Sequence, residues 1–263
     1  MLRCYRPHGL LALAAVLCAC SAKEAPVVEV KGECADVFQA QICTWVRMRG
    51  TSVVEAGATV PVASIENAPK EEPMGWPPMP VARLRLPESA NPQTGLTELT
   101  VYWEATGHPP GPYLVPHFDF HFYTVPPEEQ VAIDCAYASK PSALPAGYAL
   151  PDLTLPPEMA QMTGVSALIG LCVPHMGMHS LPAAEMNDTI PFRGTMVIGY
   201  YHGNPVFIEP MLTRALLLEK RPFDLPIPGI PGMAGAYPHT FHADYDAQQQ
   251  VYHFVFTGFA PGT

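Results

Sequence analysis

The sequence has few charged side chains, and basic ones are the scarcer kind. Charged residues make up only 14% of the 263 positions, and 14 Lys and Arg stand against 24 Asp and Glu, for a formal net charge of −10. An acidic chain repels phosphate backbones, and no basic stripe with interleaved aromatic residues is present. This composition argues against nucleic acid as a partner.

Several catalytic and metal-binding motifs are also missing. The sequence lacks a Gly-x-Ser-x-Gly elbow, a Ser-x-x-Lys pair and a Gly-rich phosphate loop. It also lacks the His-x-Glu-x-x-His helix of zinc proteases and the paired-cysteine zinc patterns, and it only loosely echoes the His-x-His-plus-Glu order of cupins. No common nucleophile is therefore indicated, and any metal site must be built from scattered residues.

Long apolar runs are absent as well. The longest run near the start, at 9–16, is shorter than the roughly 20 residues that span a bilayer, and it follows Arg3 and Arg6 as in an export signal. The sequence Leu17-Cys-Ala-Cys20 resembles a bacterial lipobox, which implies cleavage after Ala19 and acylation of Cys20. The alternative is an ordinary secretory signal with a chance cysteine.

Ser21 after this cysteine resembles lipoproteins that are sent on to the outer membrane, where they face the periplasm. Loss of the signal removes two Arg and no acid, so the formal charge becomes −12. We expect a protein of the bacterial cell envelope that meets the membrane through its lipid. Its expected parts are a signal peptide at 1–19, a lipidated tether at 20–33, an N-terminal extension at 34–80 and a β-rich domain at 81–263.

The cysteine count supports this compartment. Apart from the signal and Cys20, four cysteines remain, Cys34, Cys43, Cys135 and Cys172. An even number in an exported protein suggests two disulfides. Three pairings are open, and we favour Cys34–Cys43 with Cys135–Cys172; the alternative is free buried thiols.

Proline is abundant, at 32 of 263 residues, more than twice the usual share. Prolines divide the chain into short segments and disfavour long helices. The alternating segments predict a mainly β fold, barrel-like or sandwich-like, with short helices and long Pro-rich loops. Strands are predicted at 81–86, 99–104, 117–123, 195–202, 205–210 and 250–259, short helices at 34–48, 127–133 and 212–220, loops at 64–80, 139–158 and 226–238, and a strand or buried loop at 162–173.

The strand at 117–123 is the most strongly two-sided. Phe118, Phe120 and Phe122 point one way and can fill a core. His117, Asp119, His121 and Tyr123 point the other way, where they form a stripe of ligand and hydrogen-bonding groups. We expect a central strand whose apolar face nucleates packing and whose polar face lines a site.

Other candidate ligands are His175 and His179 around a Gly turn, His202 on the predicted hairpin, and Glu209. His117 and His121 lie about 13 Å apart along a straight strand, so they cannot share one ion. The favoured set is His121, His179 and Glu209, with His117 or Asp119 as a fourth or supporting group, and such a set suits zinc, iron or manganese.

Alternatives to this site remain open. Met176, Met178 and Met211 offer soft ligands for copper(I), or they only fill the core. The His-Asp-His row can also be a hydrogen-bonded polar layer or a solvated face. His239, His242 and His253 are expected to serve local hydrogen bonds.

Three ordered motifs resemble a known family: residues 117–123, residues 176–179 and residues 199–213. The family comprises uncharacterised exported bacterial domains, and its reference member is a hypothetical Thermus protein controlled by a sigma-E/anti-sigma-E system. The resemblance covers roughly residues 80–220. It implies a β-rich domain, self-association into a homo-oligomer and a place in envelope stress, and it brings no established reaction.

Three hypotheses follow for the function. The first is a lipid-anchored, non-catalytic envelope protein that assembles or binds a partner or metal. The second is a metal-dependent hydrolase or oxygenase with an open site. The third is a periplasmic binder of copper or zinc.

Overall fold

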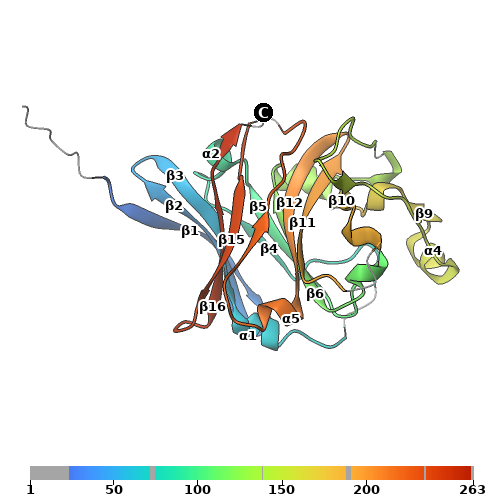
Figure 1. Cartoon of the computed structure of the whole chain (residues 1–263), viewed down its shortest axis with the longest axis horizontal. Coiled ribbons are helices and arrows are strands. Elements are labelled where there is room, and N and C mark those ends of the chain that lie inside the picture. The colour runs from blue at the N-terminus through green and yellow to red at the C-terminus, as the bar shows by residue number, and fades with distance from the viewer. Residues whose placement is uncertain (1–23, 72–74, 138, 188–190, 234, 262–263) are drawn as a thin grey trace, which may run out of the picture.

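Two large antiparallel sheets pack face to face in this protein, as the computed structural model shows (Figure 1). The structure describes residues 24–71, 75–137, 139–187, 191–233 and 235–261. The predicted signal peptide and the predicted lipidation site Cys20 lie outside the described residues. The mainly β fold predicted from the sequence is confirmed as a sandwich with short helices and long loops.

One sheet has six strands and the other has seven. The six-stranded sheet runs in the order β1 (Val27–Val37), β2 (Ala40–Arg49), β3 (Ser52–Pro61), β16 (Val251–Thr257), β15 (Thr240–Asp246) and β13 (Phe223–Pro226). The seven-stranded sheet runs in the order β4 (Ala82–Arg85), β5 (Glu98–Glu104), β6 (His117–Tyr123), β12 (Asn204–Thr213), β11 (Gly194–Tyr201), β10 (Met178–Pro182) and β7 (Tyr148–Ala149).

The remaining elements are short. Two strand pairs lie outside the large sheets, β14 (Ala236–Tyr237) with β17 (Ala260–Pro261), and β8 (Leu153–Thr154) with β9 (Ala167–Leu168). The helices are α1 (Val62–Glu66), α2 (Asn91–Thr94), α3 (Pro127–Val131), α4 (Pro157–Thr163) and α5 (Arg214–Leu217), with 3-10 turns η1 (Gly111–Tyr113), η2 (Cys135–Tyr137), η3 (Ile169–Leu171) and η4 (Glu185–Asn187). Among the described residues, no helix has the length and hydropathy to cross a membrane.

The helix predicted at 34–48 is wrong, because this segment forms the end of β1 and most of β2. Apolar residues lie on both faces of the strand β2, and together they produce a spacing that imitates one face of a helix. Ile42 and Val46 point into the sandwich core, whereas Trp45 lies on the other face under the guanidinium of Arg47, 4.5 Å from the ring centroid.

The N-terminal segments belong to the sandwich. β1 begins at Val27, inside the expected tether at 20–33, and pairs with β2. The extension expected at 34–80 supplies β2 and β3, and β3 pairs with β16 from the C-terminal end of the chain. Strands from before and after residue 81 therefore pair in one sheet, and both parts of the chain contribute to the same sandwich.

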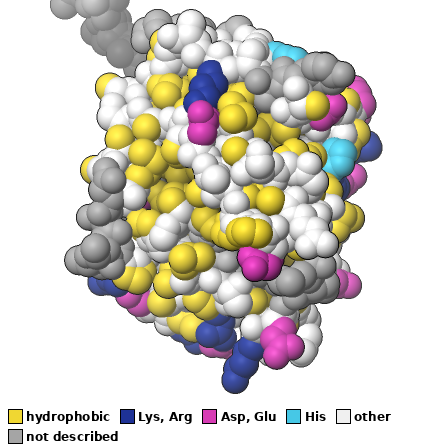
Figure 2. Space-filling view, turned by 90° about the vertical axis from the view of Figure 1, so that its right-hand side faces the viewer, with side chains coloured by type: hydrophobic (Ala, Val, Ile, Leu, Met, Phe, Trp, Pro, Cys, Tyr) yellow, Lys and Arg dark blue, Asp and Glu magenta, His cyan; other side chains and the backbone are white. Residues whose placement is uncertain are grey.

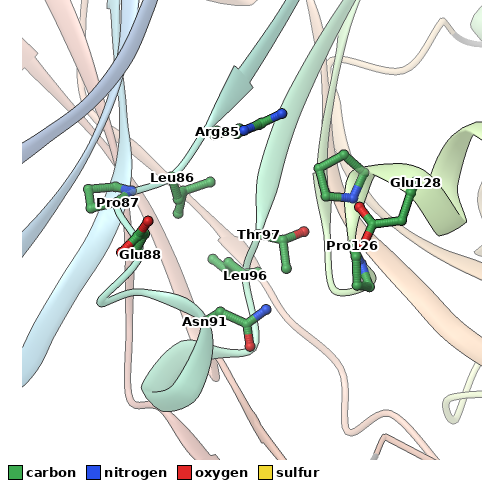
Figure 3. Close-up of a pocket in the computed structure, with 10 residues that line it drawn as sticks. Arg85, Leu86, Pro87, Glu88, Asn91, Leu96, Thr97, Pro126 and Glu128 are labelled. Carbon is green, nitrogen blue, oxygen red and sulfur yellow. The ribbon is translucent and has the colours of Figure 1, made fainter.

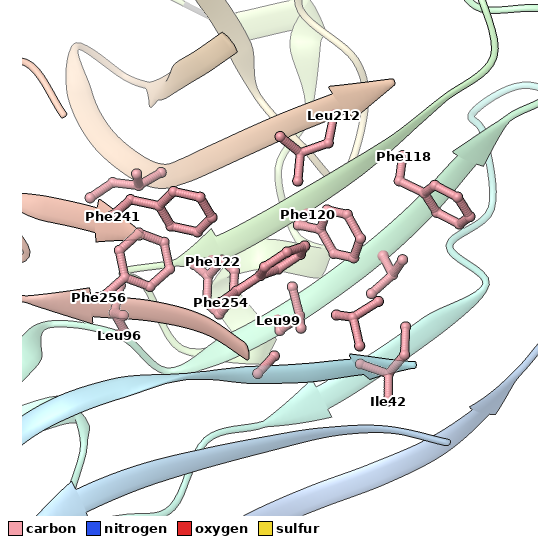
Figure 4. Close-up of a cluster of buried hydrophobic side chains, with 14 of the residues drawn as sticks. Ile42, Leu96, Leu99, Phe118, Phe120, Phe122, Leu212, Phe241, Phe254 and Phe256 are labelled. Atoms are coloured by element: carbon pink, nitrogen blue, oxygen red, sulfur yellow. The ribbon is translucent and has the colours of Figure 1, made fainter. Parts of the chain in front are cut away.

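The core lies between the two sheets and is rich in phenylalanine (Figure 4). Phe118, Phe120 and Phe122 point from β6 into this core, as predicted, and each is at most 1% exposed. Phe120 packs edge-on against Phe254, with ring centroids 4.9 Å apart, and Phe122 contacts Phe256 in the same way at 4.7 Å. The apolar face of β6 therefore holds the two sheets together.

Both favoured disulfides are confirmed. Cys34–Cys43 links the paired strands β1 and β2, and Cys135–Cys172 links η2 to the residue that follows η3. Disulfides form and persist in oxidising compartments, so the protein works outside the cytoplasm.

The hairpin predicted at 195–210 is confirmed as β11 and β12, which turn at His202 and Gly203. β12 extends to Thr213, so the following helix α5 is shorter than predicted. The segment 162–173, left open above, contains the end of α4, the short strand β9 and the turn η3.

Candidate metal centre

The polar face of β6 is buried rather than solvated. β6 lies between β5 and β12 in the seven-stranded sheet, and all seven of its residues are buried. Its outward-facing side packs under a second apolar cluster with members such as Tyr113, Leu171 and Phe192, which come from the loops that cover this sheet. The row of His117, Asp119 and His121 is therefore enclosed by protein.

Three strands bring His121, His179 and Glu209 together. They come from β6, β10 and β12, and one ligand atom from each lies within 4.8 Å of the other two. His121 Nε2 is 3.4 Å from His179 Nε2 and 3.3 Å from Glu209 Oε2. Two ligands on a tetrahedral zinc ion, with bonds near 2.0–2.1 Å, lie about 3.3 Å apart. The two distances from His121 Nε2 therefore match edges of a metal coordination polyhedron, and the third pair lies within the 4.8 Å bound.

Hydrogen bonding orients His179 for ligation. Its Nδ1 donates to the carbonyl of Leu171 at 2.9 Å, which leaves the lone pair on Nε2. Metal-ligating histidines commonly have this arrangement, with the other ring nitrogen held by a carbonyl or carboxylate. The Cys135–Cys172 disulfide lies next to Leu171, so it anchors the carbonyl that holds the imidazole.

Gly199 makes the close packing around the site possible. It pairs with Phe207 on β12 and with His179 on β10. A Cβ at this position would lie 2.0 Å from a Phe207 ring atom, so only glycine leaves room for that ring. The Phe207 ring in turn packs against His121, with centroids 4.6 Å apart, and against His179 at 5.1 Å.

Burial shapes the electrostatics of this cluster. It lowers the pKa of both His121 and His179 to about 4, which keeps both imidazoles neutral and able to donate a lone pair. Burial and the nearby charge of Asp119 raise the pKa of the Glu209 carboxyl well above its usual range, and the opposing effects of His179 and His108 are too small to reverse this. A bound divalent cation would stabilise the ionised carboxylate.

His117 and Asp119 belong to a second cluster instead. His117 Nε2 lies 3.3 Å from Asp119 Oδ1, and His108 Nε2 lies 3.7 Å from Asp119 Oδ2. The sequence reasoning missed His108, because it lies in a Gly-His-Pro-Pro turn that has no strand or helix pattern. Its place directly before Pro109 and Pro110 gave no sign that its side chain returns to β6.

The charges of the second cluster depend on one another. Burial lowers the pKa of His117 to about 4. Burial favours the neutral form of Asp119, but the neighbouring His117 and His108 outweigh it and lower the pKa of this carboxyl to about 2. Partial burial opposes the charged form of His108, whose side chain is 39% exposed, but Asp119 raises its pKa.

Both clusters line one small cavity of about 120 Å³. His179 and Glu209 from the first cluster and His108 and Asp119 from the second reach it, and most of its other walls are apolar. Figure 2 shows the face of the molecule on the side of α4 and β9, where hydrophobic side chains spread across the middle and charged ones are few. The buried donors thus lie in low-polarity surroundings.

A larger hollow of about 300 Å³ lies elsewhere, beside β4 and α2 (Figure 3). Its polar lining includes Arg85, Glu88 and Glu128 but no histidine or cysteine. It therefore lacks the nitrogen and sulfur donors that transition metals prefer.

The other histidines of the described residues lie apart from both clusters. His202 is in the turn of the β11–β12 hairpin, and His175 is exposed, with its Nδ1 donating to the Val131 carbonyl. The local hydrogen bonds expected for the C-terminal histidines are confirmed for two of them, since His242 bonds to Asp224 and Asp244 and His253 bonds to Thr59. The His239 ring stacks on Tyr237.

The three methionines divide between core and cavity. Met178 is fully buried in the sandwich core, so it is core filler. Met176 and Met211 line the cavity that His179 and Glu209 also reach. Soft thioether groups are therefore present beside the first cluster.

Together these observations define an extracytoplasmic β-sandwich protein with enclosed His/carboxylate clusters that can hold metal. No protein-family model, curated protein or solved structure matches the chain. The resemblance to the Thermus-typified family stays a prediction, and the reading of the site rests on its geometry.

Proposed function

We propose that this chain is a lipid-anchored protein of the bacterial outer membrane that binds a divalent transition-metal ion through His121, His179 and Glu209. The observation that carries the proposal is the convergence of three ligand atoms from three strands within 4.8 Å. Two imidazoles and one carboxylate suit zinc, iron(II) or manganese. Zinc fits the 3.3–3.4 Å spacing of the donor atoms.

The size of the cavity favours a binding function over catalysis. Pockets for small-molecule substrates usually have volumes of about 300–1,000 Å³, whereas this cavity has about 120 Å³. A water molecule occupies about 30 Å³ of liquid, so the cavity has room for an ion and a few waters. Such a site holds a metal for structure, storage or transfer.

A metal-dependent hydrolase or oxygenase is the second candidate. It is favoured by one observation, that the cavity reaches His179 and Glu209 and so leaves an open position beside a bound ion. Copper binding is the third, and it is favoured by Met176 and Met211 on the cavity wall. Reversible copper(I) uptake at the expense of zinc would support it.

Metal analysis of the full chain, purified in detergent without a polyhistidine tag, tests the proposal. We expect His121→Ala and Glu209→Gln each to lose one equivalent of metal relative to wild type. His175→Asn is the matched control, because its Nδ1 also bonds a backbone carbonyl but it lies on the surface outside both clusters. Unchanged metal content in Glu209→Gln, after loading with zinc, iron, manganese or copper, overturns the proposal.

The membrane anchor is tested separately. A Cys20→Ser variant should fail to incorporate labelled palmitate and should leave the membrane fraction. Retention of the label in this variant would refute lipidation at Cys20, while the metal site would be unaffected.

A further inference from the structure

The second cluster, His108, His117 and Asp119, repeats the features of the first. One ligand atom from each of its residues lies within 4.8 Å of the other two. It contains two imidazoles and one carboxylate, and it lines the same cavity through His108 and Asp119. His117 is fully buried, and Asp119 is 5% exposed.

Hydrogen bonding holds both histidines of this cluster with Nε2 toward the carboxylate of Asp119. His117 Nδ1 donates to the Val115 carbonyl at 2.7 Å, and His108 Nδ1 donates to the Pro109 carbonyl at 2.9 Å. His117, which burial keeps neutral, is thereby left with an acceptor Nε2 that faces Asp119, and His108 presents its Nε2 to the other oxygen of the same carboxylate. This is the arrangement seen at His179 in the first cluster, and it is common for metal ligands.

Two acceptors meet without a donor between them. His117 Nε2 and Asp119 Oδ1 are 3.3 Å apart, and both are buried without a hydrogen bond among the described residues. Facing lone pairs in a low-polarity cavity repel each other unless a cation lies between them. Their separation is also that of two neighbouring ligands on one ion, about 3.3 Å.

We propose that His108, His117 and Asp119 form a second site for a divalent transition-metal ion, so that the cavity serves two ions. Asp119 and His121 are alternate residues of β6, with Cα atoms about 6.6 Å apart. The two sites are thus neighbours along β6, and they have separate ligand sets. The proposal goes beyond the first site and does not depend on it.

Cobalt(II) titration of the full chain, followed by visible absorption and checked by metal analysis, tests the second site. We expect an end point at two equivalents for wild type. His117→Asn should bring it to one equivalent, because the Asn amide keeps a donor near the Nδ1 position for the Val115 carbonyl and removes Nε2. His179→Asn should also bring it to one, through loss of the first site.

Two further variants keep the test valid if His117→Asn does not fold. His108→Asn changes a partly exposed turn residue and should also remove one equivalent. His175→Asn, the surface control, should keep two. Circular dichroism and intact disulfides verify the fold of each variant.

The possible results separate the two proposals. An end point at one equivalent that His179→Asn abolishes and His108→Asn leaves unchanged overturns the second site and leaves the first intact. A wild-type end point at one equivalent that His108→Asn and His117→Asn abolish, and that His179→Asn leaves unchanged, overturns the first site and supports the second. No cobalt binding in wild type overturns both.

Discussion

Replacing Gly199 with alanine tests how the fold positions the first cluster. Gly199 lies in the middle of β11, opposite Phe207 on β12. A Cβ there would lie 2.0, 2.1 and 2.3 Å from three atoms of the Phe207 ring, and that ring is fully buried. To restore an ordinary contact of 3.4 Å, the ring has to retreat by roughly 1.4 Å toward His121 and His179.

Two opposing effects set the size of the change in stability. Gly→Ala at an unstrained position stabilises a protein by about 0.4–1 kcal/mol, because it restricts the unfolded chain. Overpacking a close-packed core costs about 1–3 kcal/mol, and three short contacts put this substitution in the upper part of that range. We expect a net loss of about 1–2 kcal/mol in the free energy of unfolding, or roughly 2–8 °C in Tm at this chain length.

Thermal unfolding by circular dichroism measures the loss, and metal analysis measures the consequence at the site. Gly229→Ala is the matched control, because a Cβ there has no neighbour within 4 Å. We expect lower metal occupancy in Gly199→Ala and unchanged occupancy in Gly229→Ala. A Gly199→Ala protein that unfolds at or above the wild-type temperature would refute the packing argument.

Three other predictions concern the disulfides, a surface histidine and the core. Removing the Cys135–Cys172 disulfide by Ser substitution should lower the free energy of unfolding by about 4 kcal/mol, and removing Cys34–Cys43 should lower it by about 2.7 kcal/mol. The first loss is larger because that disulfide closes a longer loop, with a sequence separation of 37 against 9. Equal losses in denaturant unfolding would contradict this. Burial opposes the charged form of His242, but Asp224 and Asp244 together outweigh it and raise its pKa. The stabilisation from these ion pairs is therefore complete below about pH 6.5 and disappears as pH rises through the raised pKa. His242→Gln should flatten that part of the stability-against-pH curve, and an unchanged curve would count against the ion pairs. Phe120→Ala should lower the free energy of unfolding by about 3–5 kcal/mol in the same assay, because the side chain is fully buried against Phe254. A loss under 1 kcal/mol would show that the core collapses into the space left by the ring.

The two faces of β6 show what a sequence can reveal about such a fold. Phe118, Phe120 and Phe122 alternate strictly with polar residues, so the strand and its core-facing side follow from periodicity alone. The pattern does not reveal that the polar side is also buried, because the loops that cover it carry no regular signal. Burial of both faces became clear only from the structure.

The candidate site was predictable where its residues lie on strands. His121 and Glu209 come from segments with clear strand patterns, and their strands β6 and β12 are neighbours. His108 was not predictable, because its approach to Asp119 depends on the path of a proline-rich turn. The segment 34–48 was mistaken for a helix because apolar residues lie on both faces of its strands. Trp45 faces away from the sandwich core, where Arg47 covers it, so an apolar residue in this segment does not always mark the core-facing side.

The unpartnered atoms of the site supply a final energetic argument for an occupant. Buried atoms of His117, Asp119, His121 and Glu209 make no hydrogen bond among the described residues. Each buried unsatisfied group costs about 1–3 kcal/mol, so four cost about 4–12 kcal/mol, which is comparable with the whole net stability of a typical domain, about 5–15 kcal/mol. A proton on Glu209 relieves only one of them. Cations in the two clusters would give partners to His117 Nε2, Asp119 Oδ1 and Glu209 Oε2 together, so metal binding accounts for why a fold with so strong an apolar core keeps this polar row buried.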